Sequence, residues 1–94
     1  MATATITNTS WGYNAKTGTD PTDVVTTKVF LLSIKTLGTA GSETVLIKDG
    51  KGNVLQKIVA VANKTESHDY FGVPVDGLNV TLSASTVEAN FFIK

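Results

Sequence analysis

Apolar and polar residues alternate along most of this chain in short stretches, a pattern that is typical of β-strands. The clearest example is the segment from Ser42 to Ala62, where two runs rich in Val, Ile and Leu flank the polar turn Asp49–Asn53. The glycines at positions 50 and 52 can adopt the positive φ angles that such turns require, and Asn53 tolerates the same conformation. We therefore predict a β-hairpin with strands over 43–48 and 54–62.

The rest of the chain repeats this pattern, with polar turns between short apolar stretches. The longest strand is expected over 24–36, and near residues 29–32 both of its faces are apolar. One face is expected to carry Phe30, Leu32 and Ile34, and the other Val29, Leu31 and Ser33. We predict that both faces are covered, by the N-terminal segment or by another subunit.

Two further strands are expected near the C-terminus, over 78–84 and 87–93, with Leu78, Val80 and Leu82 pointing inward. A polar connection over 63–69 and a short strand or corner at Tyr70–Phe71 are expected before them. A turn is expected over 72–77, where Pro74 argues against a central strand.

About seven strands, with turns roughly every 8–12 residues, predict an all-β fold: a single small antiparallel β-sandwich, Ig-like or jelly-roll-like. A small barrel is the alternative. We expect one domain over 1–94, with a core over 24–94 and an N-terminal strand and long loop over 1–23. That first segment is also a candidate arm, and Trp11 either caps the core or contacts another molecule.

Charge and composition argue against several classes of partner. The chain has eight basic and eight acidic residues, all the basic ones are Lys, and there is no Cys. Nucleic acids and anionic membranes are usually bound through a basic excess, so we expect neither as a partner. No apolar stretch approaches the roughly 18 residues of a membrane span, and the N-terminus does not resemble a secretory signal. We expect synthesis in a cytoplasm.

Candidate catalytic and metal-binding residues are few. His68 and Asp69 are adjacent, and adjacent side chains on extended backbone point in opposite directions, so we interpret them as solvated residues. Four aspartates offer oxygen ligands for Ca²⁺ without the spacing of an EF-hand: Asp20, Asp23, Asp49 and Asp76. We therefore expect a non-enzymatic protein without a cofactor or a metal site.

Aromatic residues are the remaining candidates for a binding surface, because they anchor protein interfaces and stack on sugar rings. These candidates are Trp11, Tyr13, Tyr70, Phe71 and Phe92. Core packing is expected for Phe30, Phe71 and Phe91. Trp11 and Tyr13 flank Gly12 in a polar segment, so an intermolecular contact is open for both of them. The residues predicted to form a protein interface are Ile6, Trp11, Tyr13, Val29 and Leu31.

The region from Val29 to Lys94 resembles small β-sandwich virion proteins of tailed bacteriophages, of the capsid decoration (cement) type. The resemblance rests on the strand Ser33–Lys35, the hairpin TVLIKDGKGNVL, the segment PVDGLNVTLSAS and a final apolar strand. It implies a non-enzymatic structural protein that binds the outer surface of a phage capsid and stabilises it. The implied partners are the major capsid protein and further copies of the chain, with a homotrimer expected. The implied location is the virion, after synthesis in the host cytoplasm, with no cofactor.

Two alternatives remain open. One is a phage tail or fibre component, including a carbohydrate-binding receptor module, which would require exposed aromatic residues arranged as a platform. The other is an Ig-like adhesion or scaffolding module of a cellular protein.

Overall fold

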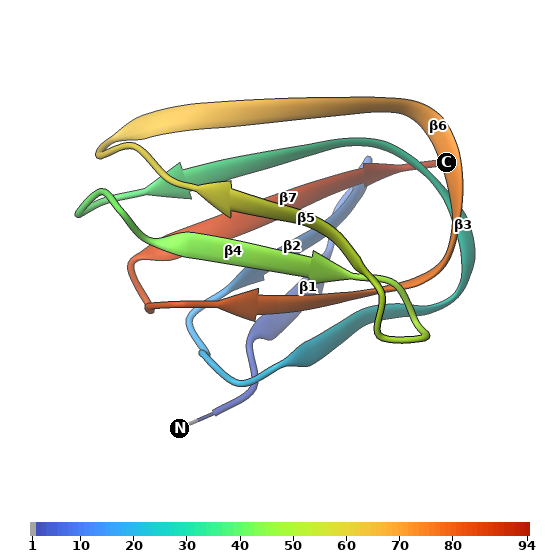
Figure 1. Cartoon of the computed structure of the whole chain (residues 1–94), viewed down its shortest axis with the longest axis horizontal. Helices are drawn as coiled ribbons and strands as arrows, with labels where there is room; N and C mark the ends of the chain where they lie inside the picture. Colours follow the sequence, from blue (N-terminus) through green and yellow to red (C-terminus); the bar gives the residue numbers. More distant parts are fainter. Residues whose placement is uncertain (1) are drawn as a thin grey trace.

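The computed structural model describes residues 2–94 and contains seven β-strands (Figure 1). They are β1 (Thr5–Asn8), β2 (Gly12–Lys16), β3 (Thr22–Gly38), β4 (Thr44–Lys48), β5 (Val54–Val59), β6 (Lys64–Leu82) and β7 (Val87–Ile93). The strands form one sheet in the order β1-β2-β7-β3-β6-β4-β5, and neighbouring strands are antiparallel. The all-β class and the number of strands are confirmed. One continuous hydrogen-bonded sheet takes the place of the two separate sheets that were expected.

The two longest strands, β3 and β6, bend sharply and give the sheet its shape. Figure 1 shows both of them turning through the right-hand side of the molecule. The register between them shifts between Asp23 and Val25, between Val25 and Lys28, and between Leu31 and Ser33. Such bulges bend a strand and increase its twist. The bend brings the part of the sheet with β7 against the part with β4, and these two strands come into contact.

The core lies inside this bend and supplies most of the stability, because each large apolar side chain contributes about 1.5–3 kcal/mol when it is buried. The predicted inward positions of β6 and the burial of Phe91 are confirmed. The buried apolar residues are Ala4, Ala15, Val24, Leu31, Ile34, Val45, Ile47, Ile58, Ala60, Val75, Leu78, Val80, Leu82, Val87, Ala89 and Phe91.

A bulge in β3 changes the predicted assignment of its faces. Leu31 and Ile34 are both buried, although strict alternation would place them on opposite faces, because the register shift between Leu31 and Ser33 moves the pattern by one residue. Phe30 and Leu32 are 46% and 38% exposed. Within the single chain, the N-terminal segment therefore leaves these two side chains uncovered, and cover by another subunit stays a prediction.

Pro74 lies inside β6, which is a central strand of the sheet. The prediction that Pro74 would exclude a central strand is therefore wrong. Its register partner on β3 is Phe30. The N–H of Phe30 donates to the C=O of Lys94 at 3.2 Å, and the C=O of Phe30 accepts from the N–H of Lys94 at 2.9 Å. Both backbone groups of Phe30 thus point to β7, so no N–H is needed from Pro74. The expected polar connection over 63–69 lies in β6 from Lys64 onward, and the turn expected over 72–77 belongs to the same long strand.

The N-terminal segment is part of the sheet. A strand and a long loop were expected over 1–23, and the structure has a second strand, β2, in place of part of the loop. β2 pairs with β1 on one side and with β7 on the other, from Gly12 opposite Phe92 to Lys16 opposite Glu88. Ala15 is fully buried. The segment therefore contributes to the core of the folded chain.

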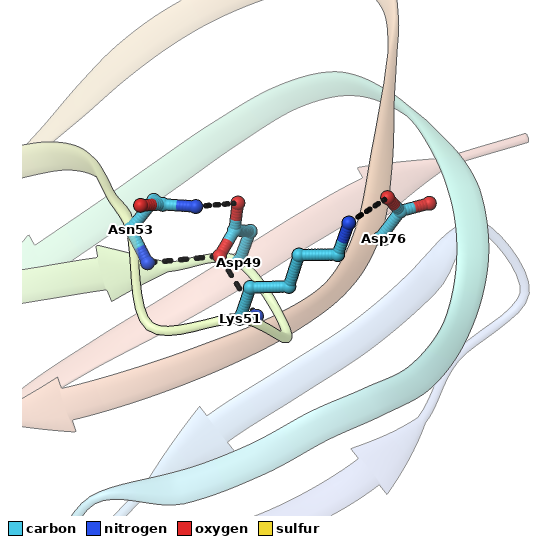
Figure 2. Close-up of polar contacts among 4 residues, drawn as sticks. All are labelled: Asp49, Lys51, Asn53 and Asp76. Carbon is cyan, nitrogen blue, oxygen red and sulfur yellow. Dashed lines mark hydrogen bonds and ion pairs between the residues drawn. The ribbon is translucent and has the colours of Figure 1, made fainter.

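The predicted hairpin is confirmed as β4 and β5, and Asp49 holds its turn (Figure 2). The carboxylate of Asp49 accepts bonds from the backbone N–H groups of Lys51 and Asn53, both at 2.9 Å, and from the Asn53 amide at 3.1 Å. These bonds, with that of the Asn53 side chain first, lower the pKa of Asp49. Lys51 Nζ lies 3.8 Å from the carboxylate of Asp76, an exposed pair that contributes little stability.

Backbone contact fixes the same turn to β6. The N–H of Gly50 donates to the C=O of Asp76 at 2.9 Å. A Cβ atom at position 50 would lie 2.1 Å from that oxygen, so only glycine permits the contact. Gly52 has the positive φ angle that was expected, 87°. At position 50, a glycine is required because of the close approach to Asp76.

A buried carboxylate closes the turn between β3 and β4. Glu43 is 5% exposed, and its Oε2 accepts bonds from the hydroxyl of Thr86 at 2.5 Å and from the N–H groups of Thr39 and Ala40 at 3.1 and 3.2 Å. The Thr86 hydroxyl is the largest cause that lowers the pKa of Glu43 from 4.5 to about 2. The charged carboxylate therefore ties this turn to the segment before β7.

Candidate functional site

Among residues 2–94, the most exposed large apolar side chain is that of Phe71, which projects from a bulge in β6. It is 91% exposed. Ser33 pairs with Asp69 and Leu31 with Val73, so three residues of β6 lie opposite one residue of β3. Phe71 has a φ of 56°, followed by a φ of 85° at position 72. This left-handed conformation is rare for a bulky residue and costs roughly 1–2 kcal/mol.

The bulge is anchored by the residue before Phe71. Tyr70 packs against the core, and its hydroxyl donates to Oε1 of Gln56 on β5 at 2.9 Å. Partial burial raises the pKa of the Tyr70 hydroxyl. The fixed position of Tyr70 therefore directs the next side chain, Phe71, away from the core and into solvent.

An open groove with a volume of about 510 Å³ lies beside Phe71. Its lining, which we call the Phe71 surface, consists of Phe30, Leu32, Phe71, Gly72 and Lys94. The paired backbone bonds between positions 30 and 94 bring β3 and the end of β7 together there. Apart from one ammonium group, the side chains of this surface are apolar, which is the character of an interaction site.

A second aromatic group lies where β2, β7 and β3 adjoin. The rings of Trp11 and Phe92 stack, with centroids 5.6 Å apart and planes inclined by 15°. Lys35 Nζ lies 5.4 Å from the centroid of the Phe92 ring, within range of a cation–π interaction. A Cβ at Gly12 would lie 2.0 Å from the C=O of Phe91, so the glycine allows the close approach of β2 to β7 beside Trp11. We call Trp11, Phe92 and Lys35 the Trp11 row.

Polar side chains continue the face of the Trp11 row along the strands. Asn14 Nδ2 donates to Oδ1 of Asn90 at 2.8 Å and to Oε2 of Glu88 at 3.2 Å. Asn90 is the register partner of Asn14 on β2 and of Lys35 on β3. Alternate positions of a strand share a face, so the side chains at 88, 90 and 92 of β7 lie together.

The five residues predicted to form an interface are not gathered at one site. Leu31 is 1% exposed and belongs to the core, so the structure corrects its assignment to a contact surface. Ile6, Tyr13 and Val29 are half-buried and pack against the core. Trp11 is 46% exposed. None of the five lines the groove beside Phe71.

The sequence analysis did not identify the Phe71 surface: Phe71 was one of the aromatic candidates, but core packing was expected for it and for Phe30. One signal was present: a glycine beside an aromatic pair within a strand pattern, at positions 70–72, indicates a bulge. The bulge in β3 carries neither Gly nor Pro, so the exposure of Leu32 had no local signal.

The candidate catalytic and calcium-binding residues do not form a cluster. His68 and Asp69 are consecutive in β6, which turns their side chains to opposite faces. Within residues 2–94, no group of three or more His, Asp or Glu is placed to hold a metal ion. Asp49 is bonded within its turn, and Asp23 accepts a bond from the side-chain amide of Asn79 at 3.0 Å.

No protein-family model, no curated protein and no solved structure matches this chain. The part of the chain that the structure describes contains no helix long and apolar enough to cross a membrane. The Phe71 surface and the Trp11 row are therefore interpreted from their own geometry.

Proposed function

We propose that this protein is a non-enzymatic structural component of a phage virion that binds the outer surface of the capsid and stabilises it. The major capsid protein is the proposed partner, and the protein acts as a homotrimer. The Phe71 surface is the proposed contact. The protein is made in the host cytoplasm and works in the virion without a cofactor.

One observation carries this proposal: an aromatic side chain that is 91% exposed stands on a strained bulge beside an apolar groove. Burial of a phenylalanine against a partner contributes about 1.5–3 kcal/mol, which offsets the cost of its backbone conformation. Phe30 and Leu32 add apolar area around it. A phenylalanine fixed in this way suits a docking protein, which acts through buried area.

Size and charge are compatible with many copies on a crowded shell. A standard interface removes roughly 800 Å² from each partner, which is about one-sixth of the 5031 Å² surface of this chain. Equal numbers of basic and acidic residues avoid long-range repulsion between neighbouring copies. We further infer that the bent sheet serves as the two layers of a small β-sandwich, an inference supported by the contact between β4 and β7.

The test uses particles of the phage that carries this gene, prepared without the protein. Purified protein is added, and bound protein is measured by co-sedimentation. We expect Phe71→Ser to weaken binding by roughly tenfold or more, because it removes the most exposed apolar contact. Val54→Ser is the matched control, because Val54 is 60% exposed on the edge strand β5 and is not part of the Phe71 surface.

Two results would overturn the proposal: absence of the protein from purified virions, or equal binding by the wild type and Phe71→Ser. We test binding with point substitutions and not with a deletion of the N-terminal segment. Deletion of residues 1–13 would remove β1 and the start of β2 from the sheet. Light scattering tests the trimer. Three copies of the 9.9 kDa chain give about 30 kDa, whereas a monomer in solution would restrict trimer formation to the shell.

A further inference from the structure

We infer that the face of β2, β7 and β3 that carries the Trp11 row binds a neutral pyranose ring of a glycan. Trp11 supplies the stacking surface, and Asn14, Asn90 and Glu88 bind the hydroxyl groups. This site lies beyond the proposed capsid contact and shares no residue with the Phe71 surface.

The aromatic part of the site is held in place before any ligand arrives. Trp11 is 46% exposed, and the ring of Phe92 supports it in a near-parallel stack with an interplanar angle of 15°. Lys35 lies over the same Phe92 ring from the neighbouring strand. A side chain that is fixed in this way loses little conformational entropy when a ligand binds. The C–H face of a pyranose ring matches the apolar face of an indole.

The polar part of the site has the hydrogen-bonding groups that hydroxyls require. An amide side chain has two N–H donors and an oxygen acceptor, and a carboxylate has two acceptor oxygens. Asn14 uses its Nδ2 group on Asn90 Oδ1 and Glu88 Oε2. This leaves Asn14 Oδ1 as an acceptor, Asn90 Nδ2 as a donor and Glu88 Oε1 as an acceptor. Because each hydroxyl donates and accepts, this mixture suits a polyol.

The charges of the face favour a neutral ligand over a nucleic acid, which also stacks on aromatic side chains. A single-stranded nucleic acid requires a groove of positive charge along its backbone. Here Lys35 is engaged with the Phe92 ring, and a second lysine of this face, Lys16, lies opposite the Glu88 carboxylate, which also accepts a bond from Asn14. Phosphate groups would therefore meet a carboxylate, whereas sugar hydroxyls would bind to it.

The experiment is a titration of the isotope-labelled full chain, followed by two-dimensional NMR. The probes are glucose, galactose and N-acetylglucosamine at millimolar concentrations, with an oligothymidylate as the comparison ligand. We expect at least one sugar to give saturable shifts at the indole N–H of Trp11 and the side-chain amides of Asn14 and Asn90. Trp11→Ala should weaken this binding roughly tenfold, the loss expected from one aromatic contact.

Two further variants keep the outcome interpretable. Asn90→Ala leaves the aromatic stack intact and should also weaken sugar binding, which separates loss of the site from loss of the fold. Phe71→Ser should bind the sugar normally, so failure of this inference and failure of the capsid proposal are distinguishable. The inference is overturned if no sugar shifts these signals, if Trp11→Ala binds as well as the wild type, or if only the oligothymidylate binds.

Discussion

The turn at Asp49–Asn53 and the bulge at Tyr70–Gly72 both interrupt regular strands, yet they differ in what surrounds them. In the turn, the Asp49 carboxylate accepts three hydrogen bonds, and Gly50 is bonded to Asp76 (Figure 2). In the bulge, Phe71 adopts a left-handed conformation while its side chain is 91% exposed. Hydrogen bonds within the protein stabilise the turn. The Phe71 side chain, in contrast, is almost fully exposed, so packing within the chain does not compensate for its unfavourable backbone conformation.

This difference separates an irregularity with a structural explanation from one to which we assign a function by proposal. Strained residues persist where the surrounding structure holds them, and they concentrate at sites of function. The Asp49 turn has a structural explanation in its bonds to β6. The Phe71 bulge is anchored by Tyr70, and under the proposed function its exposed ring is buried by a partner.

The largest expected effect comes from Gly50→Ala, which breaks the packing of the turn. The new Cβ would lie 2.1 Å from the C=O of Asp76, so the turn must move away from β6. We expect the free energy of unfolding to fall by about 2–3 kcal/mol in urea denaturation. Gly52→Ala is the control: its Cβ meets no atom within 4 Å, so only the positive φ is penalised, by about 1 kcal/mol. Equal losses for both variants would contradict the close-approach explanation.

Acid is expected to weaken the turns and to leave the bulge unaffected. Glu43 has a folded pKa of about 2, below its ordinary value of 4.5, because Thr86 and two backbone N–H groups bind its charged form. A lowered folded pKa contributes stability above pH 4.5, and this contribution is lost as the pH falls towards 2. Urea denaturation over this pH range should show a falling free energy of unfolding. Glu43→Gln should flatten that slope, and Phe71→Asn should retain it; an unchanged slope in Glu43→Gln would refute the assignment.

The smallest expected effect is a gain in stability from Phe71→Asn. Asparagine tolerates the left-handed conformation better than phenylalanine does, and the exposed ring makes little contribution within the chain. We expect the free energy of unfolding to rise by about 0.5–1 kcal/mol, while capsid binding is lost. Phe71→Val is the matched control, because a β-branched side chain fits this conformation poorly and should lower stability. A destabilised Phe71→Asn would mean that the ring packs within the fold.

The sequence predicted the elements that local rules decide. The hairpin β4–β5 follows from two β-branched runs around a Gly- and Asn-rich turn, and the inward positions of β6 and β7 follow from alternation. The prediction for Pro74 was wrong because a proline is tolerated there only when Phe30, far away in the sequence, is hydrogen-bonded to Lys94. A prediction from the proline alone does not take into account how the residue opposite it on the neighbouring strand is hydrogen-bonded.

The candidate sites were less predictable than the fold. Exposure of Phe30, Leu32 and Phe71 results from a bulge that shifts the alternation of two paired strands, and only one of those strands carries a glycine there. Trp11 was identified because its polar surroundings offered little core. Its stacking with Phe92 joins residues near opposite ends of the chain, a contact that only the sheet order reveals.

The place of β7 in the sheet order has a kinetic consequence. This strand lies between β2 and β3, which both precede it far upstream in the chain, and Gly12 pairs with Phe92. Sheets that depend on such distant pairings fold in milliseconds to seconds. Until β7 arrives, β2 and β3 have open edges that can pair with each other out of register, which is a kinetic trap. We therefore expect the insertion of residues 87–93 between them to be a slow step in forming the native sheet.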